Sequence, residues 1–129
     1  MLLQISNLDE IEKGCQEIQS FLEVTCSEDA NEAVSRGIDL GVHLARSSKM
    51  LADAKYHQDK ARKESIIKRL NVDLPASILK NLIDSDCEKE NYIVNWCDRL
   101  NSGIVHQMDF LRTMISKVKA EMQSFGNNR

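Results

Sequence analysis

The chain has 129 residues and a net charge of −3 at pH 7, and 42% of its residues are hydrophobic. A single proline and five glycines leave few helix breakers, and aromatic and β-branched runs are too sparse for a sheet. No segment approaches the roughly 18 apolar residues of a membrane span, and the first residues lack a signal-peptide pattern. We therefore expect one all-α domain, residues 1–129, in the cytoplasm and away from membranes.

Charge is distributed unevenly along the chain. Residues 1–35 carry eight acids and one base, residues 36–80 carry ten bases and five acids, and residues 81–129 are close to neutral. An acidic start beside a basic middle indicates either charge complementarity within the fold or a local anion-binding site.

The first predicted helix covers residues 7–24, within an N-terminal helical segment of residues 1–25. Asn7 can cap its N-terminus, and Glu10 three residues later completes a capping-box pattern. The apolar positions of this helix follow alternating steps of three and four residues: Leu8, Ile11, Cys15, Ile18 and Leu22.

A long second helix is expected over residues 28–71, with acids at its start that suit a helix N-terminus. Small side chains on its inward face would let a neighbouring helix approach closely. That face is predicted to contain Ala30, Ala33, Val34, Gly37, Ile38, Gly41, Leu44, Ser48, Leu51 and Ala54.

The clearest break is the segment Asn71–Pro75, because proline suits the first turn of a new helix. A short helix is predicted over residues 75–84, followed by a third long helix over residues 86–124 and a frayed tail, residues 126–129. The short helix is expected to bury Ile78, Leu79, Leu82 and Ile83.

The connection between the long helices is short, which favours antiparallel packing. We therefore expect a long helical hairpin, residues 28–71 and 75–124, with the shorter N-terminal helix beside it.

An apolar stripe along the third long helix predicts self-association. Its members are separated by three or four residues, and aromatic residues beside them widen the apolar face beyond what one hairpin can cover. We expect an oligomeric helical bundle of coiled-coil character. The predicted oligomer interface consists of Ile93, Cys97, Leu100, Ile104, Met108, Leu111, Ile115 and Val118, and the stripe continues to Met122.

The segment 55–69 holds six bases and two acids and is a candidate phosphate-binding surface. The alternative is a solvated helix face with Asp59–Lys63 and Glu64–Lys68 ion pairs. Arginine and aromatic residues on the third long helix could grip a phosphate and stack on a base. The favoured alternative is that Asp98 and Arg99 join an inter-helix salt bridge and that Trp96 belongs to the core. The candidate ligand-binding residues are Lys55, Tyr56, Lys60, Arg62, Lys63, Tyr92, Trp96, Arg99 and Arg112.

No motif predicts catalysis or a metal site. The four cysteines form no CxxC pair and are expected to be reduced thiols, and the three histidines lack the Glu-x-x-His spacing of di-metal bundles. A P-loop, a dinucleotide-binding turn and a nucleophile elbow are also lacking. We expect no catalytic residue and no cofactor.

Four stretches carry a resemblance: residues 50–57, 74–77, 91–101 and 106–117. Over residues 45–122 the chain resembles small helical proteins encoded by bacteriophages and prophages of gut bacteria. The resemblance implies a viral or mobile-element protein acting in the cytoplasm of a bacterial host, and it implies no catalytic residue.

Three functions follow as hypotheses. The first is a non-catalytic phage accessory protein that works as a helical oligomer and sequesters a host nucleotide signal as counter-defence. The second is an accessory factor that binds single-stranded nucleic acid or protein during phage replication or recombination. The third is a purely structural helical bundle.

Overall fold

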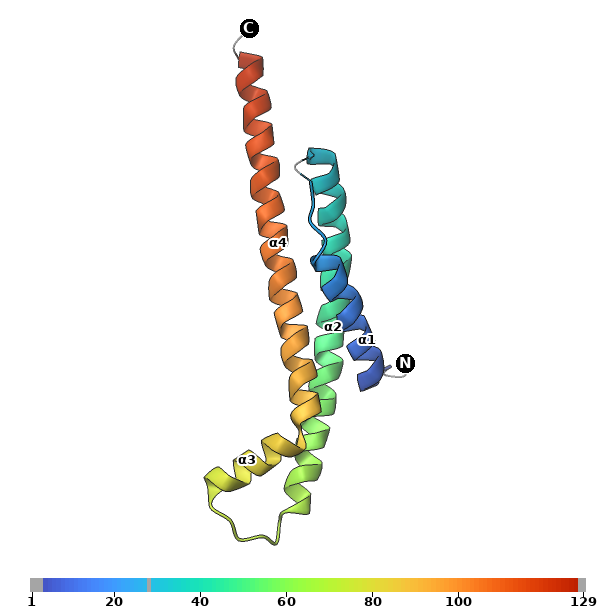
Figure 1. Ribbon diagram of the computed structural model, residues 1–129, viewed down its shortest axis with the longest axis vertical. Coiled ribbons are helices and arrows are strands. Elements are labelled where there is room, and N and C mark those ends of the chain that lie inside the picture. Colours follow the sequence, from blue (N-terminus) through green and yellow to red (C-terminus); the bar gives the residue numbers. More distant parts are fainter. Residues whose placement is uncertain (1–3, 28, 128–129) are drawn as a thin grey trace.

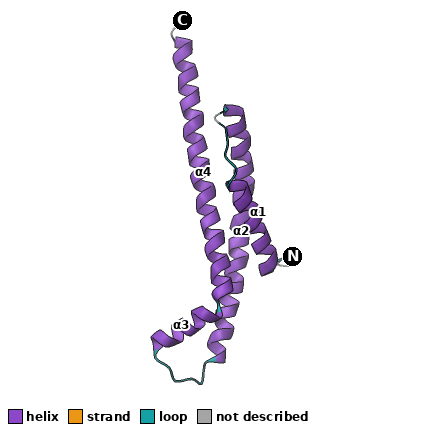
Figure 2. Ribbon diagram, viewed as in Figure 1, coloured by secondary structure: helices purple, strands orange, loops and turns teal. Residues whose placement is uncertain are grey.

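The computed structural model describes residues 4–27 and 29–127, and within them the chain is all-helical, as predicted (Figures 1 and 2). The four helices in chain order are α1 (Leu8–Leu22), α2 (Ala30–Lys68), α3 (Ala76–Asp86) and α4 (Glu88–Asn127). Helices α2 and α4 lie side by side along most of their length, and α1 lies beside their central and lower part (Figure 1). In the described part of the chain, no helix combines the length and apolarity needed to cross a bilayer.

Helix α1 is capped as the sequence predicted. The Asn7 side-chain oxygen accepts a hydrogen bond from the Glu10 backbone N–H at 2.9 Å, and the Asn7 amide donates to the Glu10 carboxylate at 2.8 Å. The buried residues Ile11, Cys15 and Ile18 belong to the predicted apolar face.

Helix α1 ends at Leu22, two residues earlier than predicted. It crosses α2 closely at Gly14, where an added Cβ would lie 2.9 Å from the Met50 sulfur. Glycine at this position therefore sets how closely the two helices approach.

Helix α2 buries only part of the predicted face: Ala33 and Ala54 are buried and Leu44 and Leu51 pack against the core, but Val34, Ile38 and Ser48 are exposed. Its fully buried positions Ala33, Leu40, Ser47 and Ala54 recur every seven residues, which is the repeat of a helix packed along one seam. Two residues expected to point inward, Val34 and Ile38, are 49% and 66% exposed. The predicted face was wrong there because apolar character alone does not show which of two adjacent stripes meets the neighbouring helix.

Helix α3 leaves the hairpin at an angle (Figure 1). Of the four residues predicted to be buried in it, only Ile83 is; Ile78 and Leu82 are exposed and Leu79 is half-buried. The helix is held to α2 by polar contacts instead: Arg62 with Asp84, and Arg69 and Ser65 with Asp86.

Helix α4 carries the predicted stripe, but much of it is core rather than an exposed interface. Ile93, Cys97, Leu100, Ile104 and Leu111 are buried within one chain, so the sequence-based assignment of these five residues to an oligomer interface is corrected. The three other members, Met108, Ile115 and Val118, are half-buried, and Met122 is exposed.

Helix α4 also extends further toward the C-terminus than predicted. The helix continues to Asn127, so residues 126 and 127 are helical rather than frayed. Residues 128 and 129 of the predicted tail lie outside the described residues.

Replacing Ile104 by alanine should lower the free energy of unfolding by about 2–5 kcal/mol, because its fully buried side chain would leave a cavity in the core. The control Leu70→Ala removes a side chain that is 70% exposed and should change stability by less than about 0.5 kcal/mol. Urea unfolding monitored by circular dichroism measures both. Equal losses for the two variants would contradict the described core.

Candidate interaction surface

The candidate ligand residues on α2 do not form a pocket. Lys55, Tyr56, Lys60 and Lys63 are exposed. Arg62 is held by the Asp84 carboxylate at 3.1 Å and fastens α3 to α2. These cations therefore present an open surface rather than a closed site.

The alternative for this segment, a solvated helix face, agrees with the exposure of its lysines, but the two intrahelical ion pairs expected with it do not form in the described part of the chain. Among the described residues no ion pair joins Asp59 to Lys63 or Glu64 to Lys68. The lysines of the segment therefore keep their charge available to solvent or to a partner.

The candidate aromatic residues on α4 lie together, with ring centroids of Tyr92 and Trp96 5.9 Å apart. Trp96 is half-buried, and its indole N–H donates to the Gln19 side chain of α1 at 3.2 Å. Trp96 therefore fastens α1 to α4, while Tyr92 stays exposed.

The two candidate arginines of α4 lie in different places. Arg99 lines a shallow polar hollow with Asn95, Asp98, Ser102 and His106. Arg112 contacts Asp109 at 3.3 Å. It lies twenty residues from Tyr92 on the same helix, which corresponds to about 30 Å. One chain therefore does not gather the nine candidate residues, and a pocket that used all of them would need more than one chain.

The cysteines form a buried pair rather than a reactive centre. All four thiols are unbridged, and the Cys15 and Cys97 sulfurs lie 3.4 Å apart in the core between α1 and α4. The contact with Cys97, together with burial, raises the pKa of the Cys15 thiol above its ordinary value. A protonated, buried thiol is a poor nucleophile. In the described residues no group of three or more metal-ligating side chains comes together.

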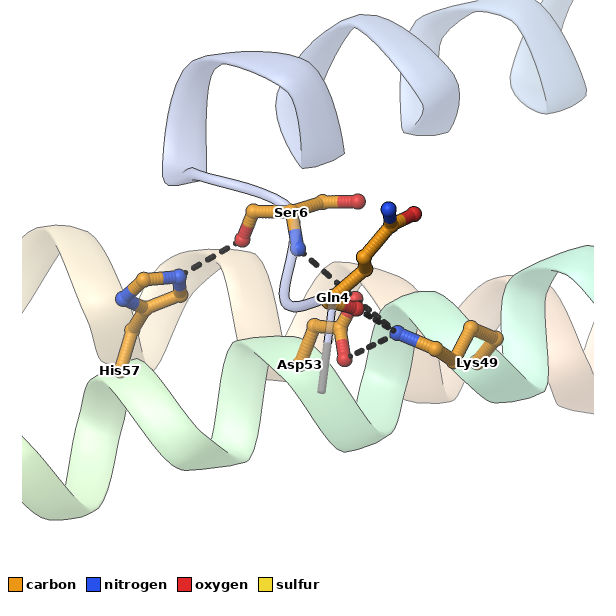
Figure 3. A network of polar contacts seen from close by, with 5 residues as sticks. All are labelled: Gln4, Ser6, Lys49, Asp53 and His57. Atoms are coloured by element: carbon orange, nitrogen blue, oxygen red, sulfur yellow. Dashed lines mark hydrogen bonds and ion pairs between the residues drawn. The ribbon is translucent and has the colours of Figure 1, made fainter. Parts of the chain in front are cut away.

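A polar network joins the segment before α1 to α2 (Figure 3). The Asp53 carboxylate, 5% exposed, accepts hydrogen bonds from the Ser6 backbone N–H at 3.1 Å and the Lys49 ammonium at 2.6 Å. Lys49 also donates to the Gln4 carbonyl, and His57 hydrogen-bonds to the Ser6 carbonyl at 2.7 Å. The Asp53 carboxylate, the Lys49 ammonium and the His57 ring each bond to the backbone of residues 4–6, so this network anchors the N-terminal segment.

A second polar cluster fastens the other end of α1. The Arg36 guanidinium donates to the Phe21 carbonyl and to Gln107 of α4, each at 3.0 Å, and it lies 4.0 Å over the Phe21 ring. The Gln107 amide donates to the Leu22 carbonyl at 3.0 Å. Helix α1, which packs on α2 and α4, therefore ends at the level of Gln107, and α2 and α4 continue beyond it.

Beyond this level lies an apolar groove between the start of α2 and the second half of α4. It is open to solvent and has a volume of about 350 Å³. Its lining consists of Ala33, Val34, Gly37, Ile38, Met108, Leu111, Arg112, Ile115 and Ser116.

Helix α4 then projects past the start of α2 as a single helix (Figure 1). We call residues 117–127 the tail, and we call the groove and the tail together the open end. The tail carries two largely exposed apolar side chains, Met122 at 70% and Phe125 at 81%.

Sequence reasoning found part of the open end and missed the rest. It placed Met108, Leu111, Ile115 and Val118 on one stripe, and these residues do line or border the open end. It missed the α2 side, because Val34 and Ile38 were expected to be covered. The signal that could have found it is the seven-residue repeat of buried positions through Leu40 and Ser47. That repeat places Val34 and Ile38 outside the core.

Comparison with protein-family models, curated proteins and solved structures finds no match for this chain. Its function is therefore inferred from the geometry and charge of the described residues.

The Asp53 network predicts a pH dependence of stability. Burial by itself would raise the pKa of Asp53, but the hydrogen bonds from Lys49 and Ser6 outweigh it and hold the pKa below its ordinary value. A lowered carboxyl pKa stabilises the fold above the unfolded pKa of about 3.9, and this stabilisation is lost as the pH falls through the lower folded pKa.

Asp53→Asn should therefore lower the free energy of unfolding by about 1–3 kcal/mol at neutral pH, and by less below about pH 4. Asp59→Asn, on the exposed face of the same helix, is the control and should show a small effect at every pH. Urea unfolding across this pH range provides the measurement. A difference between Asp53→Asn and the wild type that stays constant down to low pH would contradict the proposed network.

Proposed function

We propose that this chain is a non-catalytic helical binding protein that works through protein–protein contact at its open end. The observation that carries the proposal is the uncovered continuation of the α4 stripe. Between Ile93 and Ile104 that stripe is covered by α1 and α2. Along the groove it is covered by α2 and by the connection that follows α1, and on the tail Met122 and Phe125 are exposed.

An isolated helical segment as short as the tail gains little stability from its own hydrogen bonds. Exposed large apolar side chains on such a segment cost free energy in water unless a contact covers them. A binding role gives these side chains a physical purpose within the bundle.

The groove favours a helical partner. It runs between two helices and is lined by apolar side chains on both sides, with small residues Ala33 and Gly37 on the α2 wall. Grooves of this type accept an amphipathic helix that inserts side chains spaced three or four residues apart. This proposal agrees with the expected non-catalytic, oligomeric phage accessory protein, and it needs no catalytic group.

A photoreactive amino acid in place of Ile38 should form discrete covalent products with a protein when the chain is produced in bacterial cells and irradiated. Ile38 is the expected reporter because it lines the groove and is 66% exposed. The matched control is the same replacement at Glu12, which is exposed on α1 away from the groove.

Adding Val34→Glu to the Ile38 variant should reduce the cross-linked products, since a charge in the groove opposes an apolar partner. Gel electrophoresis and mass spectrometry detect the products. Equal labelling at Ile38 and Glu12, or no products at Ile38, would contradict the proposal.

A second candidate function is the binding of a single-stranded nucleic acid or nucleotide at Lys60 and Lys63. Both ammonium groups are exposed and have no ion-pair partner among the described residues. Tyr56 lies one turn before Lys60 on the same face and offers a partly exposed ring for stacking.

Replacing Lys60 and Lys63 together by glutamine should weaken binding of a fluorescent single-stranded oligonucleotide and reduce the salt slope by about 0.7 per lysine. Arg62 is left unchanged because it contacts Asp84. The control is a double glutamine variant of Lys117 and Lys119 on α4. Fluorescence anisotropy over a salt series measures the slopes, and unchanged slopes would exclude this site.

A further inference from the structure

We propose that the occupant of the open end is a second copy of this chain. In this arrangement the two tails pack antiparallel across a two-fold axis near residues 116 and 117, and each tail fills the groove of the other copy. The inference rests on the proposed function of the open end and adds the identity and geometry of the partner.

The spacing of the stripe is the first argument. The six positions of the stripe from Met108 to Phe125, which leave out Phe110 and Met114 on the adjacent face, are separated by three, four, three, four and three residues. This series reads the same in both directions, so an antiparallel copy places an apolar residue opposite each apolar residue. Met108 then faces Phe125 of the other copy, and Ile115 faces Val118. Met122 lies opposite Leu111, which is already buried within its own chain and forms the floor of the groove.

The lengths of groove and tail also correspond. The groove follows α4 from Met108 to Ser116, and the apolar part of the tail extends from residue 117 to Phe125. Each stretch spans about 12 Å along the helix axis. A tail in the antiparallel register therefore ends where the groove ends.

Continuity with the core supports the same occupant. The positions proposed to meet the second copy continue the stripe that α1 and α2 cover at Ile93, Cys97 and Ile104. The second tail would supply the helix that is missing beyond Gln107. The section at the groove then contains α2 and α4 of one copy and the tail of the other, which is the same number of helices as the section where α1 packs on α2 and α4.

The exposed area leaves room for such an interface. The chain exposes 9400 Å², whereas a compact monomer of 14.7 kDa exposes about 6,900 Å². The excess is larger than the roughly 800 Å² per partner that a standard interface buries.

Two further features favour a copy of the chain over a different protein. Each copy carries one groove and one tail, so a two-fold pair covers all four surfaces and leaves no open interface for further growth. Charge does not oppose the contact, since residues 108–127 contain three bases and two acids.

The first test is the mass of the purified wild-type chain and of tail variants in solution. The wild type should sediment as a dimer at micromolar concentration. Met122→Glu combined with Phe125→Glu should halve the mass, and so should Ile38→Glu on the groove side. All three side chains are exposed in the single chain, so helicity and unfolding midpoint of the monomer should be preserved.

The matched control is Ala120→Glu combined with Gln123→Glu, which adds the same charge to exposed positions on the other face of the tail. This control should remain a dimer. A monomeric wild type, or a dimer that resists the tail and groove variants, would overturn the inference.

Cross-linking tests the direction of the tails. Phe125 is replaced by the photoreactive analogue p-benzoylphenylalanine, and isotopically light and heavy copies are mixed so that links between copies are recognised by mass. The antiparallel arrangement predicts links to residues 33–38 or 108–111 of the other copy. Links to residues 118–125 of the other copy would indicate parallel tails and overturn the arrangement.

The two proposals fail differently. A monomeric purified chain that still forms Ile38 products with a different protein in cells would keep the proposed function and remove the second copy as the partner. A monomer without any Ile38 product would remove both.

Discussion

The contact between the apolar stripe of α4 and the buried positions of α2 that recur every seven residues is the interaction on which the rest of the fold depends. Each of these helices is about 60 Å long, and neither could keep so many apolar residues in water alone. Helix α1 packs against both helices beside the lower half of α4 in Figure 1. Helix α3 contributes little to this core and is held mainly through charged side chains.

Small and polar residues set the register of that contact. Ala33, Ser47 and Ala54 leave the backbone of α2 close to α4, and the buried Ser47 hydrogen-bonds to Asn101 across the seam. A second polar pair, Gln58 with Asn91, lies further along the same two helices. Because a buried polar group without a partner is costly, a slip of one helix along the other would be penalised at both pairs.

The sequence predicted the all-helical class, the Asn7 cap and the positions of the helices within a few residues, because these depend on local spacing and local capping. It did not predict which face of α2 is covered, since Val34 and Ile38 are as apolar as Leu40. It also could not separate the part of the α4 stripe that is core from the part that is exposed, because that depends on where α1 ends and α2 begins in space. The candidate ligand residues share charge and aromatic character, but Arg112 lies too far along α4 to join Tyr92 in one chain.

The burial of the α4 stripe decreases along its length: Ile93 and Ile104 are buried, Met108 and Ile115 are half-buried, and Met122 is 70% exposed. The free energy of local opening follows the same order, because each neighbour removes solvent from the helix it covers. A single continuous helix therefore contains a rigid half and a half whose order depends on what it contacts. Binding of a partner at the open end, as proposed, would then order this half of α4 locally, without a hinge and without any change in the core.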